Sequence, residues 1–217
     1  MKIQCRFESQ LSVRLALALI QNVHISTNRN PFDQTAGLAR TYHQRYADTE
    51  VHQIQGIQQA RRFFRALGID PTRRRPASEA LLQRALKQKA LPKINTAVDV
   101  GNWCALDFLL PTCVYDFSKI KGIIRIREGA ENETYKALNN REIHAQGRYI
   151  LADDDGPFGS PITDSQRTCV SPHTRNVLLG IWGPDDIAPE YLLQQLDLFS
   201  RRIIEYCGGE KTDSGAF

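Results

Sequence analysis

The densest group of residues able to support chemistry lies between positions 153 and 168. The segment reads DDDGPFGSPITDSQRT, so acidic, hydroxyl-bearing and turn-forming residues stand close together. Glycines allow a ligand to approach the backbone closely, but the same composition is typical of a long loop whose polar groups satisfy one another. Composition alone leaves both interpretations open. The side chains that offer hydroxyl or charged groups are Ser160, Ser165, Thr168, Asp164 and Arg167.

Three consecutive aspartates at positions 153–155 raise the question of a metal site. Magnesium prefers carboxylate ligands, but it usually requires a separated pair together with a phosphate. Three adjacent side chains cannot all point at one ion, so we expect them to form Asx turns instead. The sequence therefore predicts no metal site.

A second group of candidate residues consists of Gly101, Asn102 and Cys113. The Asn102 amide is suited to capping a helix or to presenting a hydrogen-bond donor to a ligand. A cysteine nucleophile needs a base, usually histidine, and the five histidines show no spacing that identifies one. We therefore expect Cys113 to be buried and unreactive. Five cysteines without a C-x-x-C pair argue against a disulfide framework and a zinc ribbon.

Basic residues are concentrated in one segment of the chain. The formal charge of the whole chain is only +4, yet positions 61–93 hold ten basic residues against Asp70 and Glu79. Such a concentrated field suits a polyanion, and a solvated helical surface would have the same composition. The basic residues of this segment are Arg61, Arg62, Arg65, Arg73, Arg74, Arg75, Arg84, Lys87, Lys89 and Lys93.

Length and composition exclude several classes of protein. The chain has 217 residues, of which 41% are hydrophobic and 24% charged, and these values exclude wholesale disorder. No apolar run approaches the ~18 residues of a membrane span. Arg14 interrupts the apolar stretch at 15–20 and no small-residue cleavage site follows, so no signal peptide is expected. Together with the odd number of cysteines, this favours a reducing, cytoplasmic location.

Helices are predicted to dominate the first third of the chain, after an initial strand. The helical spacing of apolar residues from Ile54 to Leu67 predicts a helix that ends at Gly68. A second helix is predicted to begin at Pro76, because a proline at the first helical position has no hydrogen bond to lose. Its apolar face consists of Leu81, Leu82, Ala85 and Leu86.

Short strands are predicted from position 94 onward, before a closing helix. An apolar stripe from Leu192 to Cys207 predicts that helix, which Gly208-Gly209 stops, and the tail after it is expected to fray. This order of elements favours the α+β class over a doubly wound parallel sheet. No G-x-G-x-x-G or Walker loop supports a nucleotide cofactor. We expect a buried strand at 94–98, a helix at 99–110, and strand-like runs at 122–127, 133–137, 148–152 and 176–182.

Several motifs are similar to one known family. The run from Val98 to Asn102, followed by Leu110-Pro111 and Tyr115-Asp116, resembles the B3/B4 editing region of the phenylalanyl-tRNA synthetase beta subunit. Free-standing relatives of that domain are similar in two further segments, 75–81 and 156–168. The resemblance preserves the order of the motifs from about position 61 to 209 and covers the first sixty residues only weakly. Other matching segments are 121–125, 174–179 and 204–209.

The resemblance implies a three-layer α+β domain with a mixed β-sheet, flanking helices and an enclosed pocket. In the synthetase, this pocket receives the aminoacylated 3′ end of tRNA and hydrolyses tyrosine wrongly attached to phenylalanine tRNA. We expect the corresponding pocket between the helix start at Gly101-Asn102 and the loop from Gly156 to Thr168. The implied parts of the chain are an N-terminal extension packed on the same domain (1–60), the B3/B4-like domain (61–209) and a flexible tail (210–217).

The resemblance also implies roles for individual residues. Arg167 is expected to orient Asp164 or to contact the terminal nucleotide, and phosphate contacts make affinity fall steeply with salt. The residues expected to recognise the aminoacyl group and position water are Asn102, Ser160, Ser165 and Gln166. The other residues expected to bind substrate are Gly101, Cys113, Gly156, Gly159, Asp164, Arg167 and Thr168. The residues expected to bind tRNA are Arg73, Arg74, Arg75, Arg84 and Lys87.

The chain departs from the synthetase at three pocket positions. Gly101 stands where the synthetase has threonine, Cys113 where it has histidine, and Gln166 where it has glutamate. The first hypothesis is a trans-acting deacylase of mischarged aminoacyl-tRNA, which needs no cofactor, does not use ATP and does not charge tRNA. The alternatives are a non-catalytic tRNA-binding module and an amino-acid-binding protein that reuses the pocket. The expected partner is tRNA, with no membrane and no obligate protein partner.

Overall fold

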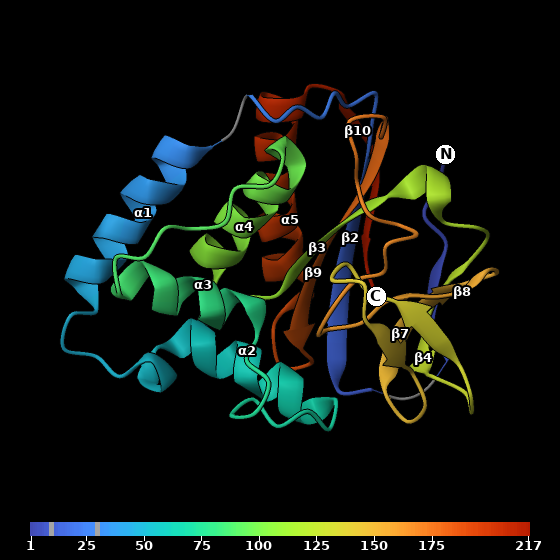
Figure 1. Ribbon diagram of the computed structural model, residues 1–217, viewed down its shortest axis with the longest axis horizontal. Coiled ribbons are helices and arrows are strands. Elements are labelled where there is room, and N and C mark those ends of the chain that lie inside the picture. The colour runs from blue at the N-terminus through green and yellow to red at the C-terminus, as the bar shows by residue number, and fades with distance from the viewer. Residues whose placement is uncertain (9–10, 29–30) are drawn as a thin grey trace.

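The computed structural model describes residues 1–8, 11–28 and 31–217 (Figure 1). Two four-stranded sheets pack face to face, and helices cover the outer face of one of them. The chain therefore has the α+β architecture that the order of elements predicts. Within the described residues, no helix has both the length and the apolar character needed to cross a membrane.

The central sheet is antiparallel and has the strand order β10-β2-β9-β3. Its strand β2 is buried on both faces, because Ala16 and Ile20 face the helices while Leu15 and Leu17 face the second sheet. Such a strand reads as a continuous apolar run, which periodicity cannot distinguish from a buried helix. The prediction of an initial strand is confirmed, and the elements that follow it in the first third are helical, as predicted. The strands are β2 (Val13–Gln21), β3 (Thr112–Asp116), β9 (Asn176–Pro184) and β10 (Glu210–Ala216).

The C-terminal tail forms strand β10, so the prediction that residues 210–217 are flexible was wrong. β10 runs antiparallel to β2, and Gly215 lies opposite Leu17. Phe217 and Leu15 exchange both backbone hydrogen bonds, with N–O distances of 2.9 and 3.0 Å. The tail sequence EKTDSGAF has no strand-like alternation of apolar residues. Backbone pairing with β2, which sequence periodicity does not reveal, forms this edge strand.

The second sheet is mixed and has the strand order β1-β4-β7-β8. β1 runs parallel to β4, and the other pairs are antiparallel. The predicted strands near 122, 133, 148 and 176 are confirmed as β4, β5, β7 and β9, whereas β3, β6 and β8 were not predicted. The elements are β1 (Cys5–Phe7), β4 (Ile124–Glu128), β7 (Tyr149–Asp153), β8 (Gly156–Gly159) and a separate hairpin of β5 (Thr134–Lys136) and β6 (Glu142–His144).

Helices α4 (Thr96–Phe108) and α5 (Pro189–Cys207) cover the outer face of the central sheet (Figure 1). The predicted apolar stripe of α5 is buried, and Gly208 ends the helix with a φ of 70°. The predicted strand at 94–98 was wrong, because Asn95 caps α4 by accepting a hydrogen bond from the Val98 N–H at 3.1 Å. Ala97 and Val100 then reach the core from the first turns of a helix.

Three further helices lie on the far side of α4 and at the end of the central sheet. α1 (Phe32–Arg45) and α3 (Ala77–Leu86) pack on α4, whereas α2 (Gln55–Ala66) packs on β9. The predicted helices that end near Gly68 and begin near Pro76 are thereby confirmed as α2 and α3. Short 3₁₀ turns follow Glu50 and Asp116, namely η1 (Val51–Gln53) and η2 (Phe117–Lys119).

Candidate functional site

One cavity, which we call the hairpin cavity, lies between the α2–α3 loop and the β5–β6 hairpin. Its volume is about 340 Å³. Tyr135 and Ser160 supply hydroxyl groups to its wall, and three arginines supply positive charge. The arginines are Arg73, Arg74 and Arg148, and apolar lining residues include Leu67, Ile69, Ile143, Ile150 and Ile162. A cavity with this lining offers an apolar surface, hydrogen-bond donors and cations together.

A hydrogen-bonded cluster fixes the two hydroxyl groups in the wall. Tyr135 Oη donates to Ser160 Oγ at 3.0 Å and lies 2.9 Å from the Thr163 carbonyl oxygen. Ser160 Oγ also accepts a hydrogen bond from the Thr163 N–H at 3.2 Å. Burial raises the pKa of Tyr135 above its ordinary value, so its phenol stays protonated at neutral pH. Ser160 Oγ in turn donates to the Thr163 carbonyl oxygen at 3.1 Å. Both hydroxyl hydrogens are therefore engaged within the cluster and must turn toward a ligand in order to donate to its carbonyl oxygen or developing oxyanion.

The residue after Thr163 belongs to a second polar group, between the two sheets. Tyr115 on β3 is 1% exposed, and its phenol donates a hydrogen bond to Asp164 Oδ1. Gly159 lies against this pair, because a Cβ there would be 2.5 Å from Tyr115 Oη and 3.0 Å from Asp164 Oδ1. Burial raises the pKa of Asp164 to about 6, although the hydrogen bond from Tyr115 acts in the opposite direction. The carboxyl therefore titrates near neutral pH.

Cys113 is buried beside the Tyr115–Asp164 pair, as expected. It lies two residues before Tyr115 on β3, so both side chains face the second sheet. Burial raises the pKa of the Cys113 thiol far above its ordinary value, which keeps the thiol protonated and unreactive at neutral pH. The structure thus brings together Cys113, Gly159 and Asp164, three of the predicted substrate-binding residues.

Other predicted residues hold the 156–168 loop in shape. Arg167 forms a bidentate ion pair with Asp153, at 2.9 and 2.7 Å, and donates to the Gly156 carbonyl at 3.2 Å. The expectation that Arg167 orients Asp164 was therefore wrong, because the fully buried carboxylate of Asp153 binds the guanidinium. The Ser165 and Thr168 hydroxyls are buried, 3.3 Å apart. Their oxygens lie inside the loop.

Gln166 ties the same loop to the β5–β6 hairpin. Its side-chain amide donates to Asn140 Oδ1 at 2.7 Å, and its backbone N–H donates to the Lys136 carbonyl at 2.9 Å. These contacts place Gln166 beside the hairpin and give it a role in positioning the cavity wall.

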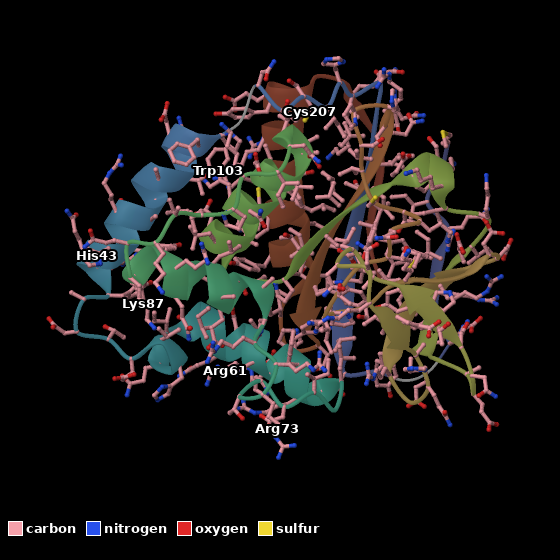
Figure 2. All side chains as sticks on the ribbon, viewed as in Figure 1. His43, Arg61, Arg73, Lys87, Trp103 and Cys207 are labelled. Carbon is pink, nitrogen blue, oxygen red and sulfur yellow. The ribbon has the colours of Figure 1, made fainter. Side chains whose placement is uncertain are left out.

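The predicted tRNA-binding residues lie in three places, and Figure 2 shows Arg73 and Lys87 well apart. Arg73 and Arg74 line the hairpin cavity, and the Arg73 side chain is 87% exposed. Arg75 lies 3.6 Å from Glu79, whose fully buried carboxylate also forms a bidentate ion pair with Arg61. The remaining two lie on α3 and just after it, where Arg84 donates to the Ala90 carbonyl at 2.9 Å and Lys87 is exposed.

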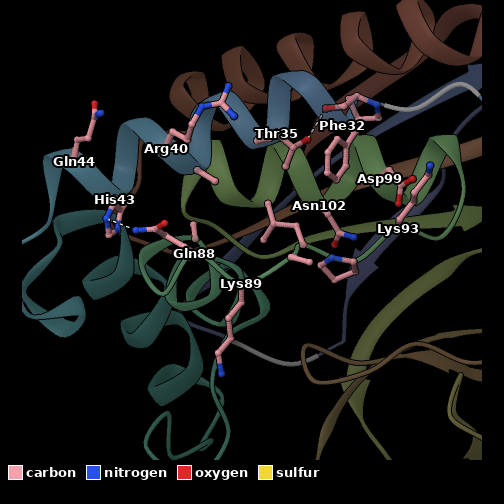
Figure 3. A pocket seen from close by; sticks show the side chains of 17 residues that line it. Phe32, Thr35, Arg40, His43, Gln44, Gln88, Lys89, Lys93, Asp99 and Asn102 are labelled. Atoms are coloured by element: carbon pink, nitrogen blue, oxygen red, sulfur yellow. Dashed lines mark hydrogen bonds between the residues drawn. The ribbon is translucent and has the colours of Figure 1, made fainter.

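Asn102 lines a different cavity, which we call the helical cavity (Figure 3). This cavity has a volume of about 400 Å³ and lies among α1, the segment after α3, and α4. Gly101 points elsewhere: a Cβ there would lie 3.1 Å from Val114 and 3.7 Å from Phe199. Successive helical residues point about 100° apart, so Gly101 faces the central sheet while Asn102 faces α1.

The predicted single pocket between Gly101-Asn102 and the 156–168 loop is therefore divided. Asn102 and Ser160 line two separate cavities, on the helical side and the hairpin side of the molecule. The spacing of the motifs does not show which face of α4 each residue occupies, and this difference in direction places Asn102 in a cavity away from the 156–168 loop. Sequence reasoning also missed Tyr135 and Arg148, since neither belongs to a recognisable motif. Tyr115 belongs to the Tyr115-Asp116 motif, but the motif does not indicate that its phenol contacts Asp164.

The part of the chain that forms most of these elements is similar to a known protein family. Residues 59–201 match the family model of the B3/4 domain. The chain belongs to the B3/4 domain family. The match includes most of α2, all of α3 and α4, the 156–168 loop and most of α5. Helix α1, which forms one wall of the helical cavity, lies outside the match.

Similar proteins in this comparison are phenylalanine–tRNA ligase beta subunits. That of Brucella abortus (strain 2308) is 28% identical over 156 residues, which cover 60% of this chain and 19% of the relative. That of Ruegeria pomeroyi is 30% identical over 154 residues, covering 59% and 19%. The chain thus spans about a fifth of the length of these relatives. An N-terminal fragment of the phenylalanyl-tRNA synthetase beta subunit from Pyrococcus horikoshii aligns with a TM-score of 0.49 and 16% identity, over 99% of this chain and 54% of that one.

Proposed function

We propose that this B3/4 protein binds the aminoacylated 3′ end of tRNA in the hairpin cavity and hydrolyses the ester there. The observation that carries the proposal is the composition of one wall: Tyr135 and Ser160 lie in the same cavity as Arg73 and Arg74. The relationship to tRNA ligase beta subunits supports tRNA as the partner. The cations suit its phosphates, and the hydroxyl groups suit its ester.

The chemistry demands little of the protein, because an aminoacyl ester is already activated. The site must hold the carbonyl, position a water and donate hydrogen bonds to the oxyanion that develops as water attacks. Tyr135 Oη donates to Ser160 Oγ at 3.0 Å, and Ser160 Oγ donates to the Thr163 carbonyl oxygen at 3.1 Å. In the proposed reaction both hydroxyl hydrogens turn from these partners to the ester oxygen, which lies in the same small region. Water adds to the carbonyl carbon, the bond to the ribose oxygen breaks, and the free amino acid and tRNA leave.

Asp164 follows Thr163 of the cavity wall but is not itself one of the lining residues, so its part in this scheme is structural. Its carboxyl accepts a hydrogen bond from Tyr115 and thereby holds the loop that carries Ser160, while the proton of the attacking water passes to the ribose oxygen as its bond to the carbonyl carbon breaks. Cys113, buried and with its pKa raised, is not a nucleophile in this scheme. No covalent intermediate on the protein is required.

Deacylation of a panel of correctly and wrongly charged tRNAs tests the proposal. We expect the unaltered protein to accelerate release of at least one amino acid, and Ser160→Ala and Tyr135→Phe to slow that release. Tyr191→Phe is the matched control, since this partly exposed tyrosine on α5 lines neither cavity. Binding of tRNA without release of any amino acid would instead establish a non-catalytic binding module. A protein that neither binds nor deacylates any tRNA would overturn the proposal.

A further inference from the structure

The helical cavity is unexplained by the proposed reaction, although it is as large as the hairpin cavity. α1 forms one wall with Phe32, Ala36 and Ala39, and the segment after α3 forms another with Leu91 and Pro92. The Phe32 ring is 51% exposed. These side chains give the cavity a broad apolar surface with one aromatic ring at its edge (Figure 3).

Three cations surround this apolar surface. Arg40 comes from α1, and Lys89 and Lys93 come from the segment between α3 and α4. None of the three forms an ion pair with another residue in the described part of the chain. The opposing carboxyl is Asp99, which accepts a hydrogen bond from the Ile94 N–H at 2.8 Å. Burial raises the pKa of Asp99, while that hydrogen bond and Lys93 act in the opposite direction. The cavity therefore favours an anionic ligand.

The Asn102 side-chain amide can hydrogen-bond to a ligand in this cavity. Asn102 lines the cavity from α4, and its side chain has no hydrogen-bond partner among the described residues. The polar side chains at the other end of the cavity already have hydrogen-bond partners: a ring nitrogen of His43 lies 2.8 Å from the Leu86 carbonyl oxygen, and the other lies 2.7 Å from the Gln88 side-chain amide. An asparagine amide both donates and accepts, which matches the donor–acceptor pairs along the edge of a nucleobase.

We propose that the helical cavity binds a nucleotide, with the base on the apolar wall, its edge on the Asn102 amide and its phosphate at the rim, in the positive field of Arg40, Lys89 and Lys93. Aromatic stacking with hydrogen bonds to base edges, beside cations for the backbone, is how proteins bind unpaired nucleotides. Lys89 and Lys93 belong to the same basic segment as Arg73 and Arg74, which line the hairpin cavity. The nucleotide is accordingly either a free monophosphate or one unit of a single-stranded RNA. The inference does not require hydrolysis.

Titration of the full chain with the four ribonucleoside 5′-monophosphates, ribose 5-phosphate and a short single-stranded RNA tests this inference. We expect at least one monophosphate to bind tenfold or more tightly than ribose 5-phosphate. Asn102→Ala should weaken its binding about tenfold, which is the usual value of a base-edge contact. Ala36→Leu, which fills the apolar wall, should abolish it. Tyr135→Phe, in the hairpin cavity, should leave it unchanged. Thermal unfolding checks that each variant remains folded.

The arms of this experiment separate the outcomes. Tighter binding of the RNA than of any monophosphate identifies an RNA unit as the ligand, and the reverse identifies a free nucleotide. Equal binding of ribose 5-phosphate, or binding that Ala36→Leu and Asn102→Ala leave intact, would overturn the inference. Because deacylation is not measured here, failure of the hydrolase proposal leaves this result unchanged, and loss of nucleotide binding leaves the hydrolase proposal standing.

Discussion

The phenol of Tyr115 donates a hydrogen bond to the carboxyl of Asp164 in the space between the two sheets. Tyr115 comes from β3 of the central sheet, and Asp164 comes from the loop that follows β8 of the second sheet. This contact fixes the loop that carries Ser160 against the central sheet. Stability and the proposed chemistry are therefore coupled through one pair of side chains.

Asp164 should make the stability of the protein depend on pH. Its pKa is raised from 3.8 to about 6 in the folded state, so the folded state holds the proton more tightly than the unfolded state. The resulting stabilisation is complete below about pH 4 and is lost as pH rises to about 6, by on the order of 1–3 kcal/mol. Denaturant unfolding across this range measures it. Asp164→Asn should flatten the profile in that window, and an unaltered profile would contradict this assignment.

Gly159 should not tolerate a side chain. A Cβ at this position would lie 2.5 Å from Tyr115 Oη, so Gly159→Ala should separate the Tyr115–Asp164 pair and destabilise the protein by roughly 1–3 kcal/mol. Gly37→Ala is the matched control, because the nearest atom there is Arg40 Nη2 at 3.9 Å. Alanine within helix α1 should stabilise by about 0.5–1 kcal/mol. Equal effects of the two substitutions would show that crowding at Gly159 is unimportant.

Breaking the Arg167–Asp153 ion pair should be costly. The Asp153 carboxylate is fully buried, so Arg167→Ala leaves a buried charge without its partner and should destabilise by about 3 kcal/mol. The control is Arg62→Ala, which removes an ion pair with Asp186 whose two side chains are 51% and 53% exposed. Such a pair contributes less than about 1 kcal/mol. Chemical denaturation compares them, and similar losses would refute a structural role for Arg167.

Arg73 and Arg74 should contribute electrostatic affinity for tRNA. Neutralising both, as Arg73→Gln with Arg74→Gln, should weaken binding at low salt and reduce the slope of log affinity against log salt by up to about 2. Arg201→Gln on α5 lines neither cavity and should change neither quantity. Filter binding or fluorescence anisotropy over a salt series measures both. A slope that the double variant shares with the unaltered protein would remove these two arginines from the interface.

Much of the fold follows from local sequence pattern. The apolar stripe from Leu192 to Cys207 and the stop at Gly208 predict α5, and alternation or short apolar runs predict β4, β7 and β9. An initial strand was predicted without bounds, because both faces of β2 are buried and its residues do not alternate. β10 was not predicted, because its side chains are polar and its backbone pairs with β2. Long-range pairing of this kind leaves no periodic signal in the chain.

The sequence predicted only some of the residues of the candidate site. The 153–168 segment does contribute Ser160 to a cavity and Asp164 to the buried pair. The contribution of Asn102 was misplaced, because one helical step turns it from the face of Gly101 toward α1. Tyr135 and Arg148 reach the hairpin cavity through the fold alone. Motif order thus identifies the family, while helical phase and hairpin packing determine which residues meet.

The most direct test of the central claim is where a hydrolysis-resistant 3′-aminoacylamino-3′-deoxyadenosine binds, followed by NMR on the backbone amides of the whole chain. This compound reproduces the acylated end of tRNA with an amide in place of the ester. We predict saturable shifts at Gly68, Gly147 and Ile162, which line the hairpin cavity, and loss of these shifts in Ser160→Ala. Saturable binding that leaves these three amides unmoved would contradict the account.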